Sequence, residues 1–163
     1  MMTLNILKRE KKMALIDHIT DNIKVAMKAK DKVRLEAFRG IKKVLLEKEV
    51  SVRPTGQTEL TPEQEMDVLV QMAKQRRDSI AQYTAANRPD LAEAEAQELA
   101  VIEEFLPQQL SEEEIFAVID ALITQVGATS AKDMGKVMGA AMQQLKGKAD
   151  GKKVQDAVKA RLG

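Results

Sequence analysis

Apolar side chains recur every three or four residues along almost the whole of this 163-residue chain. In the first such stretch Ile16, Ile19 and Ile23 follow this spacing while lysines take other positions, which is the pattern of an amphipathic helix. Strands favour β-branched and aromatic residues, and the chain has only three Phe, one Tyr and no Trp. The sequence therefore predicts an all-α fold.

Capping residues divide this periodic pattern into seven predicted helices. The clearest start is Thr61, because Pro62 suits the first helical position and Gln64 completes a capping box with the threonine. The first four predicted helices run from about Leu15 to Met27, Lys32 to Val50, Pro62 to Tyr83 and Asp90 to Leu106. The last three begin after N-caps at Ser111, Ser130 and Asp150 and end near Val126, Leu145 and Leu162, respectively. Gly127 is the predicted C′ residue of the fifth helix.

The predicted domain boundary lies at Pro107, which stops the fourth helix. We expect residues 13–107 to form a four-helix body and residues 108–163 to form a small three-helix tail domain. A tail of about 50 residues is marginally stable alone, so it would pack on the body or on a partner. Residues 1–12 precede a natural helix start at Met13. They are either a basic N-terminal extension or the product of an upstream start site, and we favour the second.

The charge of the chain is unevenly distributed although its total is only +1. Residues 1–53 carry +7 and residues 127–163 carry +5, whereas residues 54–86 carry −2 and residues 87–126 carry −9. Basic ends of this kind attract polyanions, a property that the total charge conceals.

The residue inventory offers little for catalysis or for metal binding. Cysteine is absent and His18 is the only histidine, which excludes thiolate chemistry, disulfides and multi-histidine metal sites. Two acidic runs, Glu103-Glu104 and Glu112–Glu114, are best explained as a solvated helix face and a helix N-terminus. We therefore expect no self-contained active site, no metal and no cofactor. Without an apolar run of about 18 residues or a secretory signal, we expect no membrane association and a cytoplasmic location.

Two glycines four residues apart, Gly135 and Gly139, fall inside the sixth predicted helix. Each costs about 1 kcal/mol relative to alanine in a helix, so something should approach this backbone closely. Two partners remain open, a neighbouring helix or a sugar–phosphate backbone. Lys136 lies between the glycines.

A lysine-rich loop follows that helix and leads into the last one. It contains Lys146, Gly147 and Lys148, and Lys152 and Lys153 come directly after it. Ammonium groups and backbone N–H groups in such a loop can contact phosphates, although a flexible solvated turn would have the same composition. Without aromatic side chains or arginine forks, the loop would position a nucleic-acid backbone and would not select bases.

These tail residues resemble the end of proteins of the GatB/YqeY family. The similarity covers Asp133–Gly139 and Lys146–Lys152 and extends back through Phe105–Ser111 and Arg77–Ile80 to Met27–Asp31. Together these motifs span about residues 13–163, which is the length of a stand-alone YqeY-like protein. Residues 1–12 match nothing in the family pattern.

The resemblance implies an all-helical body with a small tail, and a relationship to the C-terminal end of the B subunit of glutamine-dependent tRNA amidotransferase. In that enzyme the corresponding tail helps to hold the tRNA, while kinase and glutaminase chemistry occur elsewhere. The motifs for that chemistry have no counterpart here, so a label of carbon–nitrogen ligase with glutamine as amido-N-donor would describe the family. The resemblance points to RNA contact by Gly135, Gly139, Lys146, Gly147 and Lys148, with Lys136, Lys152 and Lys153 as weaker neighbours, and to Asp150 as a helix cap.

Three hypotheses follow for the function. The first is a non-catalytic helical protein that binds tRNA or another structured RNA and is linked to tRNA-dependent amidation. The second is an interaction module that docks on an amidotransferase or an aminoacyl-tRNA synthetase, through an apolar stripe of Met134, Met138 and Met142 that would otherwise be core. The third is an amidotransferase component that acts only within a complex.

Overall fold

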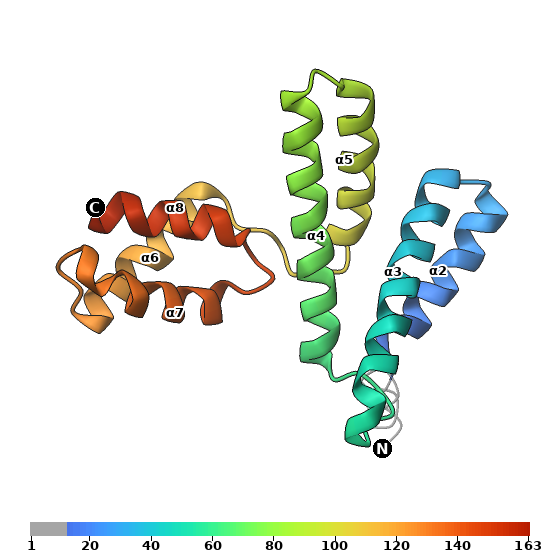
Figure 1. Ribbon diagram of the computed structural model, residues 1–163, viewed down its shortest axis with the longest axis horizontal. Coiled ribbons are helices and arrows are strands. Elements are labelled where there is room, and N and C mark those ends of the chain that lie inside the picture. Colours follow the sequence, from blue (N-terminus) through green and yellow to red (C-terminus); the bar gives the residue numbers. More distant parts are fainter. Residues whose placement is uncertain (1–12) are drawn as a thin grey trace, which may run out of the picture. The chain divides into compact units, whose positions relative to one another are not determined.

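The computed structural model describes residues 13–163, and all regular structure in this range is helical (Figure 1). The prediction of an all-α chain is confirmed. The question of whether residues 1–12 are a genuine extension concerns residues outside the described range. The described helices are α2 (Leu15–Ala29), α3 (Lys32–Val52), α4 (Pro62–Ala85), α5 (Pro89–Glu103), α6 (Glu112–Val126), α7 (Met134–Leu145) and α8 (Gly151–Leu162), with 3₁₀ turns at Arg53–Thr55 and Ala131–Asp133.

Most helix starts lie where the sequence places them. Thr61 and Gln64 form the predicted capping box, Ser111 and Asp150 cap α6 and α8, and Gly127 ends α6 in the left-handed conformation, with φ of 69°. Two boundaries differ from the prediction. The fourth predicted helix ends early, at Glu103, because the N–H groups of the next two residues bond to carbonyls three positions back and tighten the last turn. Ser130 caps a 3₁₀ turn, so α7 begins only at Met134.

Contacts between Cα atoms divide the chain into two compact units. The N-terminal unit ends at Phe105 and contains α2 to α5, and the C-terminal unit, Leu106–Gly163, contains α6 to α8. Each unit has its own buried apolar side chains.

The described part of the N-terminal unit, residues 13–105, contains two helical hairpins, α2–α3 and α4–α5, joined through packing of α3 against α4 and α5. Its core includes Phe38, which is 1% exposed and meets Phe105 edge-on with ring centroids 6.0 Å apart. The other buried apolar side chains come from all four helices: Ile19, Ala26, Ala37, Ile41, Leu45, Val52, Val68, Leu69, Met72, Ala73, Val101 and Ile102.

Arginines of this unit pair with its own acidic residues. Arg34 donates two hydrogen bonds to the Glu104 carboxylate, each 3.0 Å long, and Arg77 lies 3.3 Å from Glu103. Arg76 reaches two acidic side chains of α5. Glutamates of α5, together with Glu104 directly after it, therefore hold α5 against α3 and α4.

Helix α2 is capped by a distant side chain. Ala14 at its N-terminus provides no side-chain cap, but the N–H of Leu15 donates to the Glu65 carboxylate of α4 at 2.6 Å. Burial raises the pKa of Glu65, against the lowering effect of this hydrogen bond. The bond fixes the start of α2 against α4.

The C-terminal unit is a three-helix bundle around an apolar core. Its buried residues come about equally from the three helices: Ile115, Ile119 and Leu122; Val137, Ala141 and Leu145; Val154, Ala157 and Val158. Met134 and Met138 are partly buried and pack against this core. Met142, which completes the predicted methionine stripe, is 41% exposed.

Candidate nucleic-acid interface

The lysine-rich loop between α7 and α8 begins with a tight turn. Lys146 has φ −54° and ψ 124°, Gly147 has φ 78°, and the N–H of Lys148 donates to the carbonyl of Leu145 at 2.8 Å. These values define a type II turn, which requires positive φ at its third residue and therefore favours glycine. Gly147 is also buried, so the structure assigns it to shaping the turn, whereas Lys146 and Lys148 are exposed on either side.

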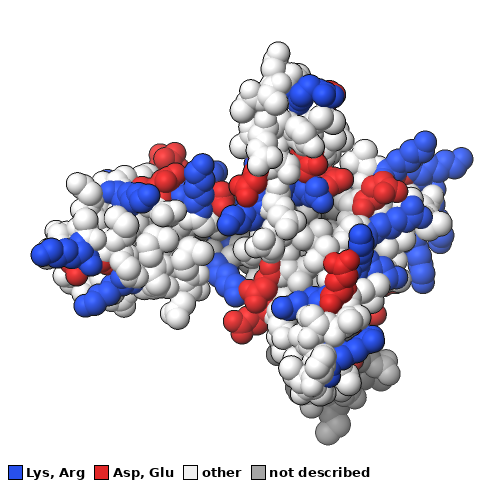
Figure 2. Space-filling model, viewed as in Figure 1, with Lys and Arg blue, Asp and Glu red and all other residues white. Residues whose placement is uncertain are grey.

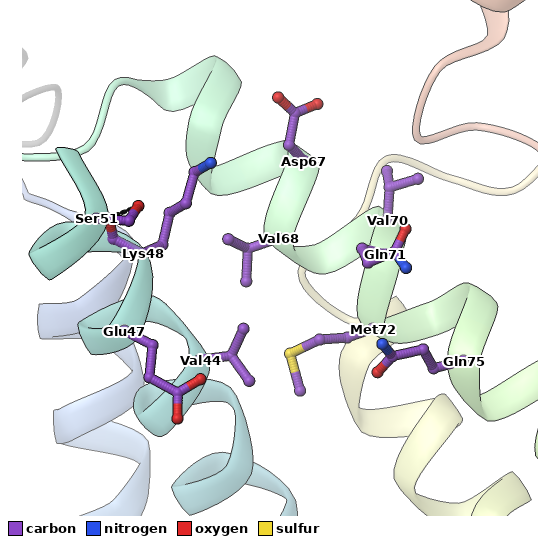
Figure 3. Close-up of a pocket in the computed structure, with 10 residues that line it drawn as sticks. All are labelled: Val44, Glu47, Lys48, Ser51, Asp67, Val68, Val70, Gln71, Met72 and Gln75. Carbon is purple, nitrogen blue, oxygen red and sulfur yellow. Dashed lines mark hydrogen bonds between the residues drawn. The ribbon is translucent and has the colours of Figure 1, made fainter.

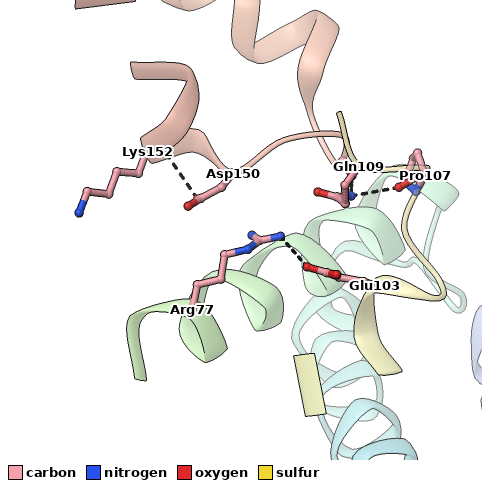
Figure 4. Close-up of polar contacts among 7 residues, drawn as sticks. Arg77, Glu103, Pro107, Gln109, Asp150 and Lys152 are labelled. Carbon is pink, nitrogen blue, oxygen red and sulfur yellow. Dashed lines mark hydrogen bonds and ion pairs between the residues drawn. The ribbon is translucent and has the colours of Figure 1, made fainter. Parts of the chain in front are cut away.

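The segment before α6 holds this turn in place (Figure 4). The side-chain amide of Gln109 donates to the carbonyls of Pro107 at 3.0 Å and Gly147 at 2.7 Å. The N–H of Leu110 donates to the carbonyl of Lys148 at 2.8 Å. The sequence predicts no contact between Gln109 or Leu110 and this loop, although both lie in the stretch Phe105–Ser111 that resembles the GatB/YqeY family. The position of the loop thus depends on residues nearly 40 positions earlier in the chain.

The first turn of α8 presents two exposed lysines, Lys152 and Lys153. Asp150 accepts a hydrogen bond from the N–H of Lys152 at 3.4 Å, so this carboxylate caps the helix as predicted. In Figure 4 the Lys152 side chain extends away from the capping carboxylate. The ammonium group of Lys152 is therefore directed away from the capping carboxylate.

The two glycines of α7 leave part of that helix uncovered. Gly135 and Gly139 are exposed, and a Cβ placed at either would meet no heavy atom of the described chain within 4 Å. Of the two partners that the sequence leaves open, a neighbouring helix is therefore not found among the described residues. Met142 lies on the same face by helical periodicity, and its side chain would contact a Cβ at Gly151, the first residue of α8, at 3.5 Å. The exposed face of α7 that contains Gly135 and Gly139 thus ends at Met142, beside the first residue of α8.

The predicted RNA-contact residues form two groups. Lys146, Lys148, Lys152 and Lys153 belong to the loop and the first turn of α8, whereas Gly135 and Lys136 lie at the other end of α7, about 15 Å away at 1.5 Å per residue. Lys136 is near Asp133, whose pKa is lowered chiefly by the Thr129 N–H at 3.0 Å and to a lesser extent by Lys136.

Three lysines, one in the loop and two in the first turn of α8, have no oppositely charged partner among residues 13–163. The side chains of Lys148, Lys152 and Lys153 form no ion pair or hydrogen bond with residues 13–163. The arginine of α8 behaves differently, because Arg161 pairs with Asp120 at 2.9 Å and lies 4.5 Å from the Phe116 ring centroid. Arg161 therefore stabilises the bundle, while the lysines remain accessible to an anionic ligand.

Comparison with known proteins places this chain in a family. The family model described as Yqey-like protein matches residues 16–162. The chain belongs to the YqeY-like protein family. This result agrees with the tail motifs and with the all-helical fold.

Curated relatives of this YqeY-like chain are yeast proteins named "Altered inheritance of mitochondria protein 41, mitochondrial". The relative from Kluyveromyces lactis is 30% identical over 145 residues, which cover 87% of this chain and 72% of the relative. That from Lachancea thermotolerans is 31% identical over 113 residues, covering 68% and 59%. That from Saccharomyces cerevisiae strain YJM789 is 27% identical over 120 residues, covering 70% and 63%. The chain thus spans less than two thirds of two of these relatives.

The names of these relatives correct one prediction. The lack of a membrane span or secretory signal in the sequence predicts a cytoplasmic location. That prediction was wrong by this comparison, since the curated relatives are named as mitochondrial proteins. The physical reason is that a lack of spans and secretory signals does not distinguish the cytosol from an organelle.

A hollow of this YqeY-like chain lies elsewhere, between α3 and α4 (Figure 3). It measures about 800 Å³ and is lined by apolar Val44, Val68 and Met72 and by several polar side chains. Its serine is not arranged as a nucleophile, because the Ser51 hydroxyl donates to the backbone carbonyl of Lys48 at 2.6 Å. Across residues 13–163 no three acidic or histidine side chains come together as a metal site.

Within the same described range, no helix alone is long and apolar enough to cross a membrane, although α6 taken together with residues 131–145 passes the length and composition test despite a bend of 96° between them.

Proposed function

We propose that this YqeY-like chain is a non-catalytic protein that binds tRNA or another structured RNA in connection with tRNA-dependent amidation. The observation that carries the proposal is the accessible surface formed by the bare glycine face of α7 and the uncompensated lysines at the start of α8. A sugar–phosphate backbone can approach a helix closely only where side chains are absent, and exposed ammonium groups beside that face neutralise its phosphates.

The chemistry of this surface favours recognition by shape. The C-terminal unit has a single aromatic residue, Phe116, and Arg161 lies over its ring, so no free aromatic platform is present in the described unit. Lys146, Lys148, Lys152 and Lys153 would contact phosphates, with Lys136 at the far end of α7. Binding through about four phosphates should be strongly salt dependent, with an affinity loss of roughly 100-fold between 50 and 200 mM salt.

The test is binding of the purified chain to bulk tRNA and to duplex DNA of similar length across a salt series. We expect tighter binding to tRNA and a slope that corresponds to release of several counterions. Equal, weak binding to both polymers would show that the lysines are ordinary solvated surface and would contradict the proposal.

A second candidate is a protein-docking module for an amidotransferase or an aminoacyl-tRNA synthetase. The observation in its favour is Met142, an adaptable side chain that is 41% exposed on the same α7 face. Met134 and Met138 contribute little to such a surface, since they pack on the core of the unit. A partner that co-purifies after nuclease treatment and is lost on Met142→Ser substitution would favour docking over RNA binding. Stimulation of glutamine-dependent amidation by a partner preparation would indicate an amidotransferase component.

We also propose that residues 13–107 and 108–163 are separate folding domains, a four-helix body and a three-helix tail. The division of contacts between Phe105 and Leu106 and the separate buried side chains support this proposal. Its test is whether a core substitution in one unit leaves the amide protection of the other unit unchanged.

A further inference from the structure

A shallow apolar hollow lies on α3, apart from the surface proposed to bind RNA. Leu46 is 43% exposed and Val50 is 55% exposed. Together with Arg39, Lys42, Lys43 and Glu47 they line a hollow of about 400 Å³. All of these residues belong to α3, so the hollow is a feature of one helix face.

This face is distinct from the side of α3 that forms the core. The buried residues of α3 are Ala37, Phe38, Ile41, Leu45 and Val52. At 100° per residue, Val50 lies 140° around the helix from Leu45, while Leu46 and Val50 are one turn apart on a common side. The exposed pair is therefore not an edge of the core that reaches the surface. Two aliphatic side chains at this spacing match the i and i+4 anchors of a second helix.

The apolar pair is accompanied by positive charge. Arg39, Lys42 and Lys43 lie about one to two turns before Leu46. Lys42 and Lys43 have no ion-pair partner among the described residues. Figure 2 shows that basic side chains gather over the region of α2 and α3.

The acidic groups near the hollow offset this charge only in part. Glu36 pairs with Arg39 at 3.3 Å, but both side chains are more than half exposed, so the pair is weak. Glu47 also lines the hollow and lies one turn after Lys43 on the same side of α3, where no ion pair joins the two among the described residues. The surface is therefore apolar towards the C-terminal end of α3 and positive towards the N-terminal end.

We propose that this face of α3 binds an acidic amphipathic helix of a partner protein. Two apolar side chains of that helix, one turn apart, would cover Leu46 and Val50, and Asp or Glu residues one to two turns away would pair with Arg39, Lys42 and Lys43. Charge complementarity identifies the sign of the partner, and the apolar pair identifies its amphipathic character.

The same observations disfavour the other occupants of a basic surface. Phosphates gain nothing from the aliphatic pair, so an RNA backbone on this face would leave Leu46 and Val50 uncovered. A lipid surface is held by broad apolar faces with aromatic anchors, whereas this hollow has only two aliphatic side chains. A hollow on one helix also limits the contact to the small interfaces typical of transient complexes, so we expect weak, micromolar or weaker, binding.

The test uses the isotope-labelled full chain and two synthetic 18-residue peptides, observed by NMR. One peptide carries leucines at i and i+4 spacing flanked by glutamates, and in the other lysines replace the glutamates. We expect the acidic peptide to shift amide signals of residues 39–50 and the basic peptide to leave them unchanged. The variant Lys42→Glu/Lys43→Glu should bind the acidic peptide at least tenfold more weakly, and so should Leu46→Ser/Val50→Ser.

Val25→Ser is the matched control, since Val25 is 64% exposed on α2 and the variant should bind as the unchanged chain does. Three results would each overturn the proposal. The first is equal binding of the two peptides. The second is an unchanged dissociation constant in the charge-reversed variant. The third is that tRNA or phosphatidylglycerol vesicles shift the amide signals of α3 whereas the acidic peptide does not. Because this surface lies in the N-terminal unit, none of them bears on RNA binding by α7 and α8.

Discussion

The arginines of the N-terminal unit and the lysines around the start of α8 in the C-terminal unit differ in how their charges are used. In the N-terminal unit Arg34, Arg76 and Arg77 each pair with a glutamate and hold α5 in place. In the C-terminal unit Lys148 and Lys152 have no such partner among residues 13–163. The planar guanidinium suits fixed pairs with carboxylates, whereas a flexible ammonium group remains hydrated and mobile. The difference shows that local charge counts reveal a binding surface only after charges engaged in the fold have been subtracted.

The largest expected effect concerns the independence of the two units. Leu45 in the N-terminal unit is 1% exposed and Leu145 in the C-terminal unit is 2% exposed. Leu45→Ala and Leu145→Ala should each lower the free energy of unfolding by about 2–5 kcal/mol, because each leaves a cavity in a packed core. Amide hydrogen exchange should show lost protection only in the unit that carries the substitution. Equal loss in both units would show that they unfold together.

The second prediction tests the uncompensated lysines. Lys148→Glu/Lys152→Glu should lower the affinity for tRNA by roughly 100-fold at low salt, because two phosphate contacts become repulsive. Fluorescence anisotropy would measure the affinity, and circular dichroism would verify folding. Lys24→Glu/Lys74→Glu is the control, with the same change in net charge on exposed helix positions of the N-terminal unit. Equal losses in the two variants would mean that total charge, and no particular surface, governs binding.

The third prediction separates stability from binding on α7. Since a Cβ at Gly135 or Gly139 meets only open space, each alanine substitution should raise the free energy of unfolding by about 1 kcal/mol. The double substitution Gly135→Ala/Gly139→Ala should weaken tRNA binding severalfold, because the new methyl groups would stand where the proposed interface brings a phosphate backbone. Urea titration and binding measurements on one preparation would compare the two effects. A more stable variant with unchanged affinity would remove the glycine face from the proposed interface.

The smallest effect belongs to the N-terminal unit and depends on pH. Burial raises the pKa of Glu65 above its value in the unfolded chain, so the folded state binds the proton more tightly. The corresponding contribution to stability is present below the unfolded pKa of 4.5 and is lost as the pH rises through the folded pKa. Glu65→Gln, whose side-chain oxygen can still accept from Leu15, should remove this part of the pH dependence. Urea unfolding from pH 4 to 7 would measure it, and identical pH profiles for both proteins would contradict it.

The sequence predicts those features of the fold that depend on neighbouring residues. The capping box at Thr61, the cap at Asp150 and the C′ glycine at position 127 all involve bonds within a few residues, so their spacing is visible in the sequence. The cap of α2 by Glu65 joins residues 50 positions apart, and the bond from Gln109 to Gly147 spans 38. Such bonds leave no periodic pattern in the sequence.

The candidate interface shows the same limit. Its residue types were identified from composition and motif, but burial changed the meaning of two of them. Gly147 is enclosed by the turn that it forms, while Met142 is open to solvent although its spacing fits a core position. A period of three or four residues identifies an apolar stripe but does not fix its width, and the packing of α6 and α8 decides which edge is covered.

The hydrogen bonds of Gln109 and Leu110 bear on where a working fragment of this protein can begin. A fragment that starts at Ser111 would retain α6, α7 and α8 complete, and its circular dichroism would resemble that of the full bundle. It would nevertheless lack both tethers of the lysine turn, which is free to sample other conformations once they are removed. The few residues before the first helix of the bundle therefore decide whether a minimal version also keeps the conformation of the lysine turn on which the proposed interface depends.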